Sequence, residues 1–275
     1  MELMVFSDEV YNLIDASSPL IKLDTGYVFV EGPVFYDHSC YFTDFQVDKI
    51  YRYTNGKSVL IDDQSHFSIG MTYDRKKNRI LKCTREKHAI TDLQGNVIID
   101  HYQGIRLNGS NDVIVDSTGR IFFTDPLSRK IEGVQIGHSS VFMFDEEKSE
   151  MTLLDSTLTY PNGLALSPDE RFLYIADTNA NAVYKIDLAT KEMECFIKLD
   201  QAMGEGRPDG LRLDKEGNLY ITGPGGIWLV NPEGQPLGII KMPEVAANLC
   251  FDEKGLFITA TGSIYHVDTK IPSAV

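Results

Sequence analysis

The chain has 275 residues, of which 40 are acidic and 26 are basic, so its formal net charge is −14. This acidic excess argues against nucleic acid or an anionic membrane as the main partner, because contacts to phosphate groups require a basic face. The apolar runs fall short of the roughly 18 residues that a membrane-spanning helix needs.

Residues 1–20 precede the first regular unit of the sequence. They begin with acidic rather than basic residues, among them Glu2 and Asp8, so we expect no secretory signal. The cysteines are widely spaced and form no CxxC pair; they are Cys40, Cys83, Cys195 and Cys250. We interpret them as reduced core residues of a cytoplasmic protein, although one disulfide remains open.

From residue 32 onwards the chain repeats one pattern six times. An alternating apolar stretch leads into an acidic or glycine-rich turn, and an aromatic-rich stretch follows, often ending in Thr-Asp or Ala-Asp. The copies are Gly32–Asp44, Gly70–Thr84, Asp112–Asp125, Gly163–Asp177, Gly210–Thr222 and Leu249–Thr259. Further strands are expected at Lys49–Tyr53, Ser140–Phe144, Ala182–Ile186, Gly226–Val230 and Ser263–Val267. These short runs between Gly, Asp, Asn and Pro turns are typical of strands joined by hairpins.

The repeat predicts an all-β protein, a six-bladed β-propeller in one domain over residues 1–275. Six copies in 275 residues give about 46 residues each, which is a propeller blade of four strands. A β-sandwich or barrel would not explain the recurrence. Trp228 is the single tryptophan and no Trp-Asp pair occurs, which disfavours the protein-binding WD40 type. Residues 1–20 are expected to supply a lead-in segment and an outer strand that closes the ring.

Four residues with oxygen donors stand just before the innermost strands: Glu31, Asn111, Asn162 and Asp209. Aliphatic residues follow the last three at the second and fourth positions, so the period of two places them at one equivalent point in different blades. They should therefore meet at one mouth of the central channel.

Oxygen donors without His or Cys are the preference of a hard cation, Ca²⁺ above Mg²⁺ or Mn²⁺. Glu31 and Asp209 would balance one divalent charge. Taken singly, Asn-Gly and Asp-Gly are ordinary turn dipeptides, as Asn55-Gly56 is expected to be. The shared repeat position favours a common site.

Several motifs together resemble the family of gluconolactonase, senescence marker protein and luciferin-regenerating enzyme. Glu31-Gly-Pro33 looks like its first metal motif, Pro161–Asp169 like its asparagine motif and Pro208-Asp-Gly210 like its aspartate motif. Tyr102–Asp112, with Phe123–Pro126, is similar to the bacterial gluconolactonase branch. The resemblance covers about Glu31 to Val267. It implies a six-bladed propeller that hydrolyses lactones with one divalent cation, Ca²⁺ first, with Mg²⁺, Mn²⁺ or Zn²⁺ as substitutes in vitro.

Two departures from that family bear on substrate choice. The branch often has Ser-Pro-Asn-Asp where this chain has Gly109-Ser-Asn-Asp112. Its second blade often carries Asn-Gly and a histidine-bearing turn, whereas this chain has Ile69-Gly-Met71 and Arg85-Glu86. The physiological lactone therefore remains open, as do the metal used in the cell and the choice between a monomer and a small homo-oligomer.

The expected mechanism is attack of water on a lactone carbonyl that the cation polarises. Asp209 is expected to serve as ligand and general base, with Glu31 as a fixed ligand and Asn162 binding the ion. Asn111 binds either the cation or a substrate hydroxyl, and Arg106 and Asn108 are candidate substrate contacts. Two alternatives stay open: a promiscuous esterase or phosphotriesterase using the same ion, and a non-enzymatic propeller with a structural cation.

Overall fold

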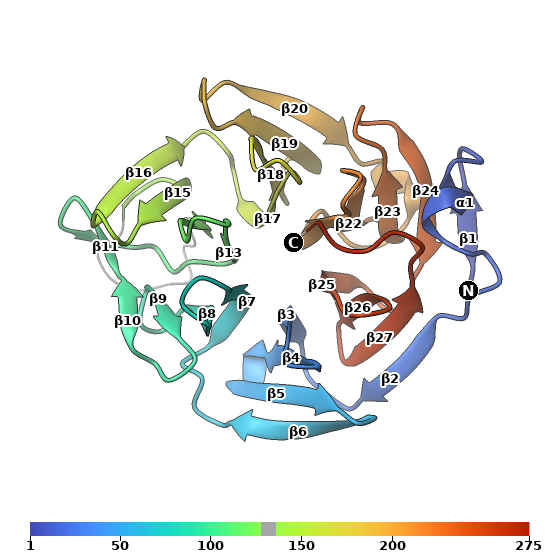
Figure 1. Ribbon diagram of the computed structural model, residues 1–275, viewed down its shortest axis with the longest axis horizontal. Helices are drawn as coiled ribbons and strands as arrows, with labels where there is room; N and C mark the ends of the chain where they lie inside the picture. The colour runs from blue at the N-terminus through green and yellow to red at the C-terminus, as the bar shows by residue number, and fades with distance from the viewer. Residues whose placement is uncertain (128–135, 275) are drawn as a thin grey trace.

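The computed structural model describes residues 1–127 and 136–274. Within these residues, six antiparallel sheets of four or five strands surround a central channel (Figure 1). The chain is therefore an all-β protein, and the six-bladed propeller predicted from the repeats is confirmed. The first strand of each blade borders the channel, so six equivalent chain positions meet there.

The first four blades are each built from consecutive strands. Blade 1 contains β3 (Val30–Tyr36), β4 (Ser39–Asp44), β5 (Lys49–Thr54) and β6 (Lys57–Asp62). Blade 2 contains β7 (Ser68–Asp74), β8 (Arg79–Thr84), β9 (Ala89–Asp92) and β10 (Val97–Ile99). Blade 3 contains β13 (Val113–Val115), β14 (Ile121–Asp125), β15 (Ser140–Asp145) and β16 (Glu150–Asp155). Blade 4 contains β17 (Pro161–Leu166), β18 (Phe172–Asp177), β19 (Ala182–Asp187) and β20 (Met193–Lys198).

The last two blades each take an outer strand from the N-terminus. Blade 5 contains β21 (Leu211–Leu213), β22 (Leu219–Gly223), β23 (Gly226–Val230), β24 (Pro236–Lys241) and, outermost, β1 (Leu3–Val5). Blade 6 contains β25 (Ala246–Phe251), β26 (Gly255–Ala260), β27 (Ser263–Asp268) and, outermost, β2 (Ile21–Thr25).

The remaining elements are small. A two-stranded hairpin of β11 (His101–Tyr102) and β12 (Ile105–Arg106) connects blades 2 and 3. The helical turns are α1 (Val10–Leu13), η1 (Phe45–Val47) and η2 (Gln201–Met203). In the described part of the chain, none of the helices has the length and apolar character needed to cross a membrane.

Ring closure depends on a strand just beyond the expected segment. The strand within residues 1–20, β1, extends blade 5 by pairing with β24. The strand that joins the first part of the chain to blade 6 is β2, which pairs with β27 through Ile21 opposite His266 and Thr25 opposite Ser263. Residues 1–20 therefore brace blade 5, and the closing strand begins at Ile21. Both strands cover a sheet edge that would otherwise expose unpaired backbone groups.

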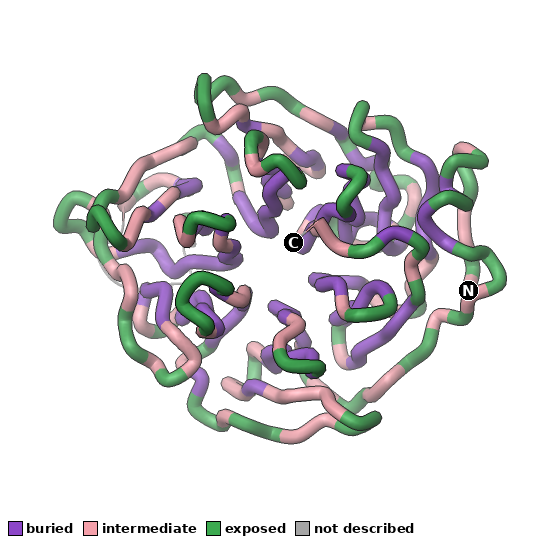
Figure 2. Tube along the Cα trace, in the orientation of Figure 1, coloured by how far each residue is buried: buried purple, intermediate pink, exposed green. Residues whose placement is uncertain are grey.

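Packing between neighbouring blades forms the core. One buried cluster joins Ile114 and Phe122 of blade 3 to Leu164 and Ile175 of blade 4, as expected when strands with alternating apolar residues stack face to face. Figure 2 shows the burial concentrated on the inner strands and the exposure in turns and outer strands. This explains one wrong expectation about the cysteines: Cys195 is exposed, because it lies on the outermost strand of blade 4.

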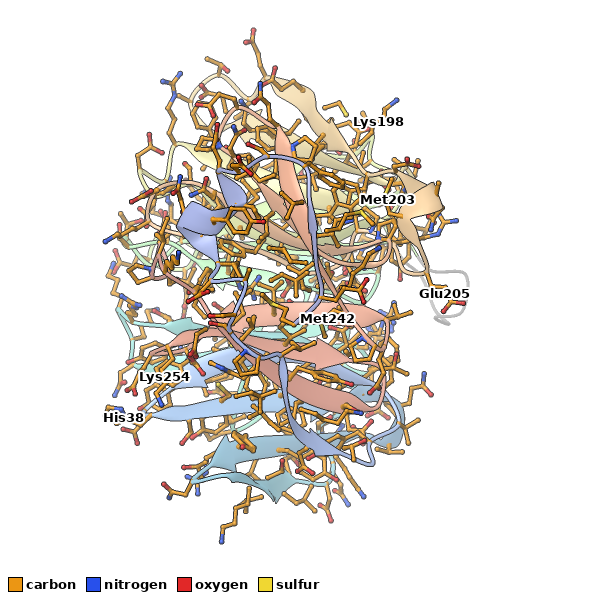
Figure 3. The ribbon with its side chains drawn as sticks, turned by 90° about the vertical axis from the view of Figure 1, so that its right-hand side faces the viewer. His38, Lys198, Met203, Glu205, Met242 and Lys254 are labelled. Carbon is orange, nitrogen blue, oxygen red and sulfur yellow. The ribbon has the colours of Figure 1, made fainter. Side chains whose placement is uncertain are left out.

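The channel has two different ends. Figure 3 shows His38 and Lys254, in turns that follow inner strands, on the face opposite Met203 and Glu205, which precede an inner strand. Towards the ends of the inner strands, on the side of His38 and Lys254, lies a cavity of about 160 Å³ to which all six inner strands contribute. The C-terminal segment lies over the centre of the ring there, and the Ala274 N–H donates to the Leu213 carbonyl oxygen at 3.1 Å.

A carboxylate reinforces the closing strand. Glu244, just before β25, accepts hydrogen bonds from Lys22 of β2 at 2.9 Å and from the Tyr265 hydroxyl of β27. Partial burial opposes its ionisation, but hydrogen bonds from Ser263, Tyr265 and Lys22 outweigh burial and lower the pKa of Glu244 to about 2. The ionised group thus stabilises the closed ring.

We predict that Glu244→Gln lowers the melting temperature at neutral pH, and that the difference from wild type disappears in acid. Because the folded-state pKa lies below the ordinary value of 4.5, the stabilisation is complete above that value and is lost as the pH falls towards about 2. Thermal denaturation followed by circular dichroism across this range tests the prediction. The exposed Glu233→Gln is the matched control, and a pH-independent difference for Glu244→Gln would contradict the explanation.

Candidate metal centre

The four predicted ligands lie where the inner strands begin, at one end of the channel. Glu31 and Asn162 are the second residues of β3 and β17, and Asn111 and Asp209 stand two residues before β13 and β21. Glu31, Asn111 and Asn162 are buried, whereas Asp209 is half-buried. The equivalent position is Ile69 in blade 2, where no side-chain oxygen is available.

Three of these side chains interact with one another. Asn162 lowers the pKa of the Asp209 carboxyl, whereas the charge of Glu31 raises it. Asn162 Nδ2 also donates to Thr178 Oγ1 at 3.0 Å, and that hydroxyl donates to the Pro208 carbonyl oxygen at 2.7 Å. Blades 4 and 5 are therefore joined at the mouth through hydrogen bonds.

The expected substrate contacts have other partners. Asn108 is fully buried, and its Nδ2 donates to the carbonyl oxygens of Asp125 and His138 at 3.0 and 2.8 Å. These bonds order the loop before Asn111, and the expected contact of Asn108 with the substrate stays a prediction. Arg106, on β12, donates to the Glu86 carbonyl oxygen at 3.3 Å and does not join the ligand group. Asn111 lies at the ring position expected for a ligand.

Aspartates at the ends of second strands hold the loops that carry three of the ligands. Asp125 accepts the N–H groups of Asn108 and Gly109 at 2.8 and 3.0 Å. Asp177 accepts those of Thr159 and Tyr160 at 2.7 and 3.1 Å. Asp44 does the same for Val28 and Phe29. In each loop the candidate ligand follows two residues after the second of these N–H groups. Asp44, Asp125 and Asp177 thus stabilise the turns that precede three of the candidate ligands.

We predict that Asp177→Ala weakens binding of a divalent cation about tenfold to a hundredfold, the range for groups that orient ligands. The loop before Asn162 would lose the acceptor for Thr159 and Tyr160. Isothermal titration calorimetry with Ca²⁺ measures the change. Asp187→Ala, which removes a comparable turn aspartate at the end of β19, should leave the affinity unchanged. Equal losses in both variants would point to general destabilisation.

One residue after each ligand position, the chains of neighbouring blades nearly touch. Gly163 donates its N–H to the Asp209 carbonyl oxygen at 3.0 Å, and Gly210 donates to the Ala247 carbonyl oxygen at 2.9 Å. A Cβ on Gly163 would collide with the Asp209 carbonyl oxygen, and one on Gly210 with Asn248. Glycine is needed here because the backbones must approach closely.

Two of the six blades carry polar side chains at this second position, Asp112 and Asn248, and both are buried. Asn248 Nδ2 lies 3.4 Å from Glu31 Oε2, which also accepts the Gly32 N–H at 3.1 Å. Asn248 also stabilises the ionised form of Asp112, although burial raises the pKa of that carboxyl more strongly. Both donors contact Oε2 of Glu31, and Oε1 has no hydrogen-bond partner among the described residues. The sequence analysis did not identify Asn248, although its position in the repeat, one residue after the ligand position and equivalent to Asp112, would have indicated it.

Arg212 supplies the positive charge beneath this layer. Its Nη1 lies 3.8 Å from Asp112 Oδ2, an atom without a hydrogen-bond partner among the described residues. Nη1 also donates to the Leu211 carbonyl oxygen at 2.7 Å. In the repeat, Arg212 stands three residues after the ligand position, where the other blades have uncharged residues. It is thus the counter-ion of the one fully buried carboxylate in the second layer.

We predict that Arg212→Met destabilises the fold by about 2 kcal/mol. Removing one partner of a buried ion pair costs about 3–5 kcal/mol, and 17% side-chain exposure with a 3.8 Å separation reduces it here. The double variant Arg212→Met/Asp112→Asn should recover about half of the loss, because no buried charge is left unpaired. Urea denaturation of the three variants provides the values. Additive losses would show that the two side chains do not form a pair.

Electrostatics at the mouth favour a bound cation. Burial, with the charge of Asp112 beside it, raises the pKa of Glu31 to about 7. Burial, followed by repulsion from Glu31 and Asp112, raises the pKa of Asp209 well above its ordinary value. Arg212 pairs with Asp112, so Glu31 and Asp209 have no ion-pair partner among the described residues. No group of three or more His, Cys, Asp or Glu side chains suited to a metal occurs in the described residues. The candidate donors instead comprise two carboxylates and two amides.

Comparisons with known proteins agree with this architecture. Residues 29–262 match the family model described as the SMP-30/Gluconolactonase/LRE-like region. A gluconolactonase of Zymomonas mobilis is 30% identical over 96% of this chain and 85% of its own length. The solved structure of a gluconolactonase of Xanthomonas campestris has a TM-score of 0.90 at 25% identity, covering 98% of this chain and 95% of that one.

A more distant structure shares the fold. It is a calcium-binding protein, regucalcin, of Agrobacterium tumefaciens, with a TM-score of 0.73 at 17% identity over 94% of this chain and 98% of that chain. At this identity the similarity is evidence for the propeller architecture alone.

Proposed function

Because the chain belongs to the SMP-30/gluconolactonase/LRE-like family, we propose that it is a lactonase that opens sugar lactones with one divalent cation. The hydrolase class expected from the sequence is the class of the relatives named gluconolactonase. The cation would be held by Glu31, Asn111, Asn162 and Asp209.

The observation that carries the proposal is the juxtaposition of Glu31 and Asp209 at a mouth that also contains amide groups. Two carboxylates that repel each other in a largely buried site are unfavourable unless a positive charge lies between them. Arg212 is committed to Asp112, so it does not fill this role. Carboxylate and amide oxygens suit a hard cation, and we propose Ca²⁺ as the first choice.

When bound, the cation supplies polarisation of the lactone carbonyl and compensates the negative charge that develops as water attacks. The two carboxylates differ in what they can do. Glu31 is only 5% exposed and is held through Oε2, so it acts as a fixed ligand. Asp209 is half-buried and faces the mouth, so we propose that its carboxylate accepts the proton of the attacking water as general base. Asn162 stabilises the ionised form of Asp209.

We predict that Ca²⁺-loaded protein hydrolyses D-glucono-1,5-lactone and that EDTA abolishes the activity reversibly. Asp209→Asn should lower kcat at least about a hundredfold, as expected for loss of a general base that is also a ligand. A pH-stat assay measures acid release, and the exposed Asp63→Asn serves as the control. Protein that binds no divalent cation by calorimetry would contradict the metal site.

The same assay separates the proposal from the two alternatives. A panel of sugar lactones, acyl lactones and organophosphates tests whether the site is a promiscuous esterase or phosphotriesterase. Cation binding without turnover of any member of the panel would indicate a structural cation in a non-enzymatic propeller.

A further inference from the structure

Blade 2 departs from the loop-anchoring pattern at the mouth. In blades 1, 3 and 4 the second strand ends in an aspartate, but in blade 2 it ends in Thr84, and Arg85 follows directly. Its backbone N–H donates to the Phe67 carbonyl oxygen at 3.3 Å, as those of Phe45 and Thr178 do to their own loops, so Arg85 occupies the position just after the aspartates. Blade 2 therefore lacks the anchoring carboxylate and carries a cation at the next residue.

The guanidinium of Arg85 has few partners. Nη2 donates to the Tyr160 hydroxyl at 3.3 Å, and the guanidinium carbon lies 5.6 Å from the centre of the Phe45 ring. Nε is buried without a hydrogen-bond partner, and no ion pair forms with a carboxylate in residues 1–127 or 136–274. By contrast, Arg79 and Arg120 pair with aspartates at 3.0 and 2.6 Å. Burying N–H donors of a guanidinium without hydrogen-bond acceptors costs free energy, and a ligand that supplies acceptors removes this cost.

The charge of Arg85 acts on the mouth. It lowers the pKa of both Glu31 and Asp125, although burial raises each of them more strongly. Tyr160, its hydrogen-bond partner, stands two residues before Asn162 on the loop that carries this ligand. Arg85 thus lies beside the reaction centre and remains available to a bound molecule.

Apolar rings beside Arg85 narrow the kind of molecule it can take. Phe45 and Phe67 contact each other with ring centres 6.3 Å apart, and Phe67 is 40% exposed. Such rings can contact the C–H face of a sugar, while a guanidinium matches the planar, two-oxygen geometry of a carboxylate. The aromatic rings and the guanidinium together suit a sugar that carries a carboxylate.

We propose that Arg85 binds a carboxylate of the substrate, so that the preferred lactones are those of sugar diacids rather than neutral aldonolactones. This inference rests on the proposed lactonase function. Arg85 determines specificity: the substrate carboxylate accepts from the Nη–H groups that the bond to Tyr160 leaves free, and the lactone carbonyl is directed to the mouth between Glu31 and Asp209.

The test compares two lactones of the same ring size, D-glucaro-1,4-lactone and D-glucono-1,4-lactone, with Ca²⁺-loaded protein. We expect wild type to favour the carboxylated lactone in kcat/KM. Arg85→Gln, which keeps a donor for Tyr160, should reduce that preference about tenfold or more, mainly through KM. Arg85→Lys should retain part of the preference, since lysine keeps the positive charge but cannot donate two parallel hydrogen bonds to one carboxylate. Arg75→Gln, at the other end of the channel, is the matched control.

A binding measurement keeps the inference separate from catalysis. Calorimetry with the ring-opened products, glucarate and gluconate, should show tighter binding of the diacid by wild type and no such difference in Arg85→Gln. Hydrolysis of the neutral lactone with a preference that does not depend on Arg85 would overturn the inference and leave the proposed function standing. Absence of all hydrolysis, with binding selectivity that requires Arg85, would overturn the function and support the anion site.

Discussion

The site depends on the close contact between neighbouring inner strands around the channel. Gly70, Gly163 and Gly210 each donate an N–H to the backbone of the next blade, and the acceptors belong to the ligand position itself. A side chain at Gly163 or Gly210 would push the blades apart. The ligand backbones are thus held by the closed ring, and this ring in turn requires the pairing of β2 with β27. The pairing of β2 with β27 at the outer rim therefore also fixes the positions of the candidate ligands at the mouth.

Within that ring, the protein concentrates carboxylates where burial disfavours them. Glu31 and Asp209 repel each other, and Asp112 lies beneath them. The arrangement is tolerated because Arg212 partners Asp112 and because Asn248 and Asn162 stabilise the ionised carboxylates. What remains is a site with negative charge and oxygen donors in excess, which is suited to a divalent cation. A local cost in folding is the expected signature of a functional site.

Function in this propeller lies in departures from its own repeat. The aspartates that end second strands anchor loops in three blades, whereas the second blade has Thr84 at this position and brings the positive charge of Arg85 to the mouth at the next residue. The ring of glycines is likewise interrupted at Asp112 and Asn248. A symmetric scaffold provides equivalent positions, and a few exceptional residues give each position a separate task.

The repeat in the sequence was sufficient to predict the six blades, most strand positions and the convergence of Glu31, Asn162 and Asp209, because period-two alternation assigns each residue to a face. It did not reveal that Asn108 is fully buried, that β2 rather than residues 1–20 closes the ring, or that Asn248 donates to Glu31. These features depend on contacts between blades that are far apart in the chain, such as Glu31 and Asn248. Local sequence determines which residues face the channel; only closure of the ring decides which of them meet.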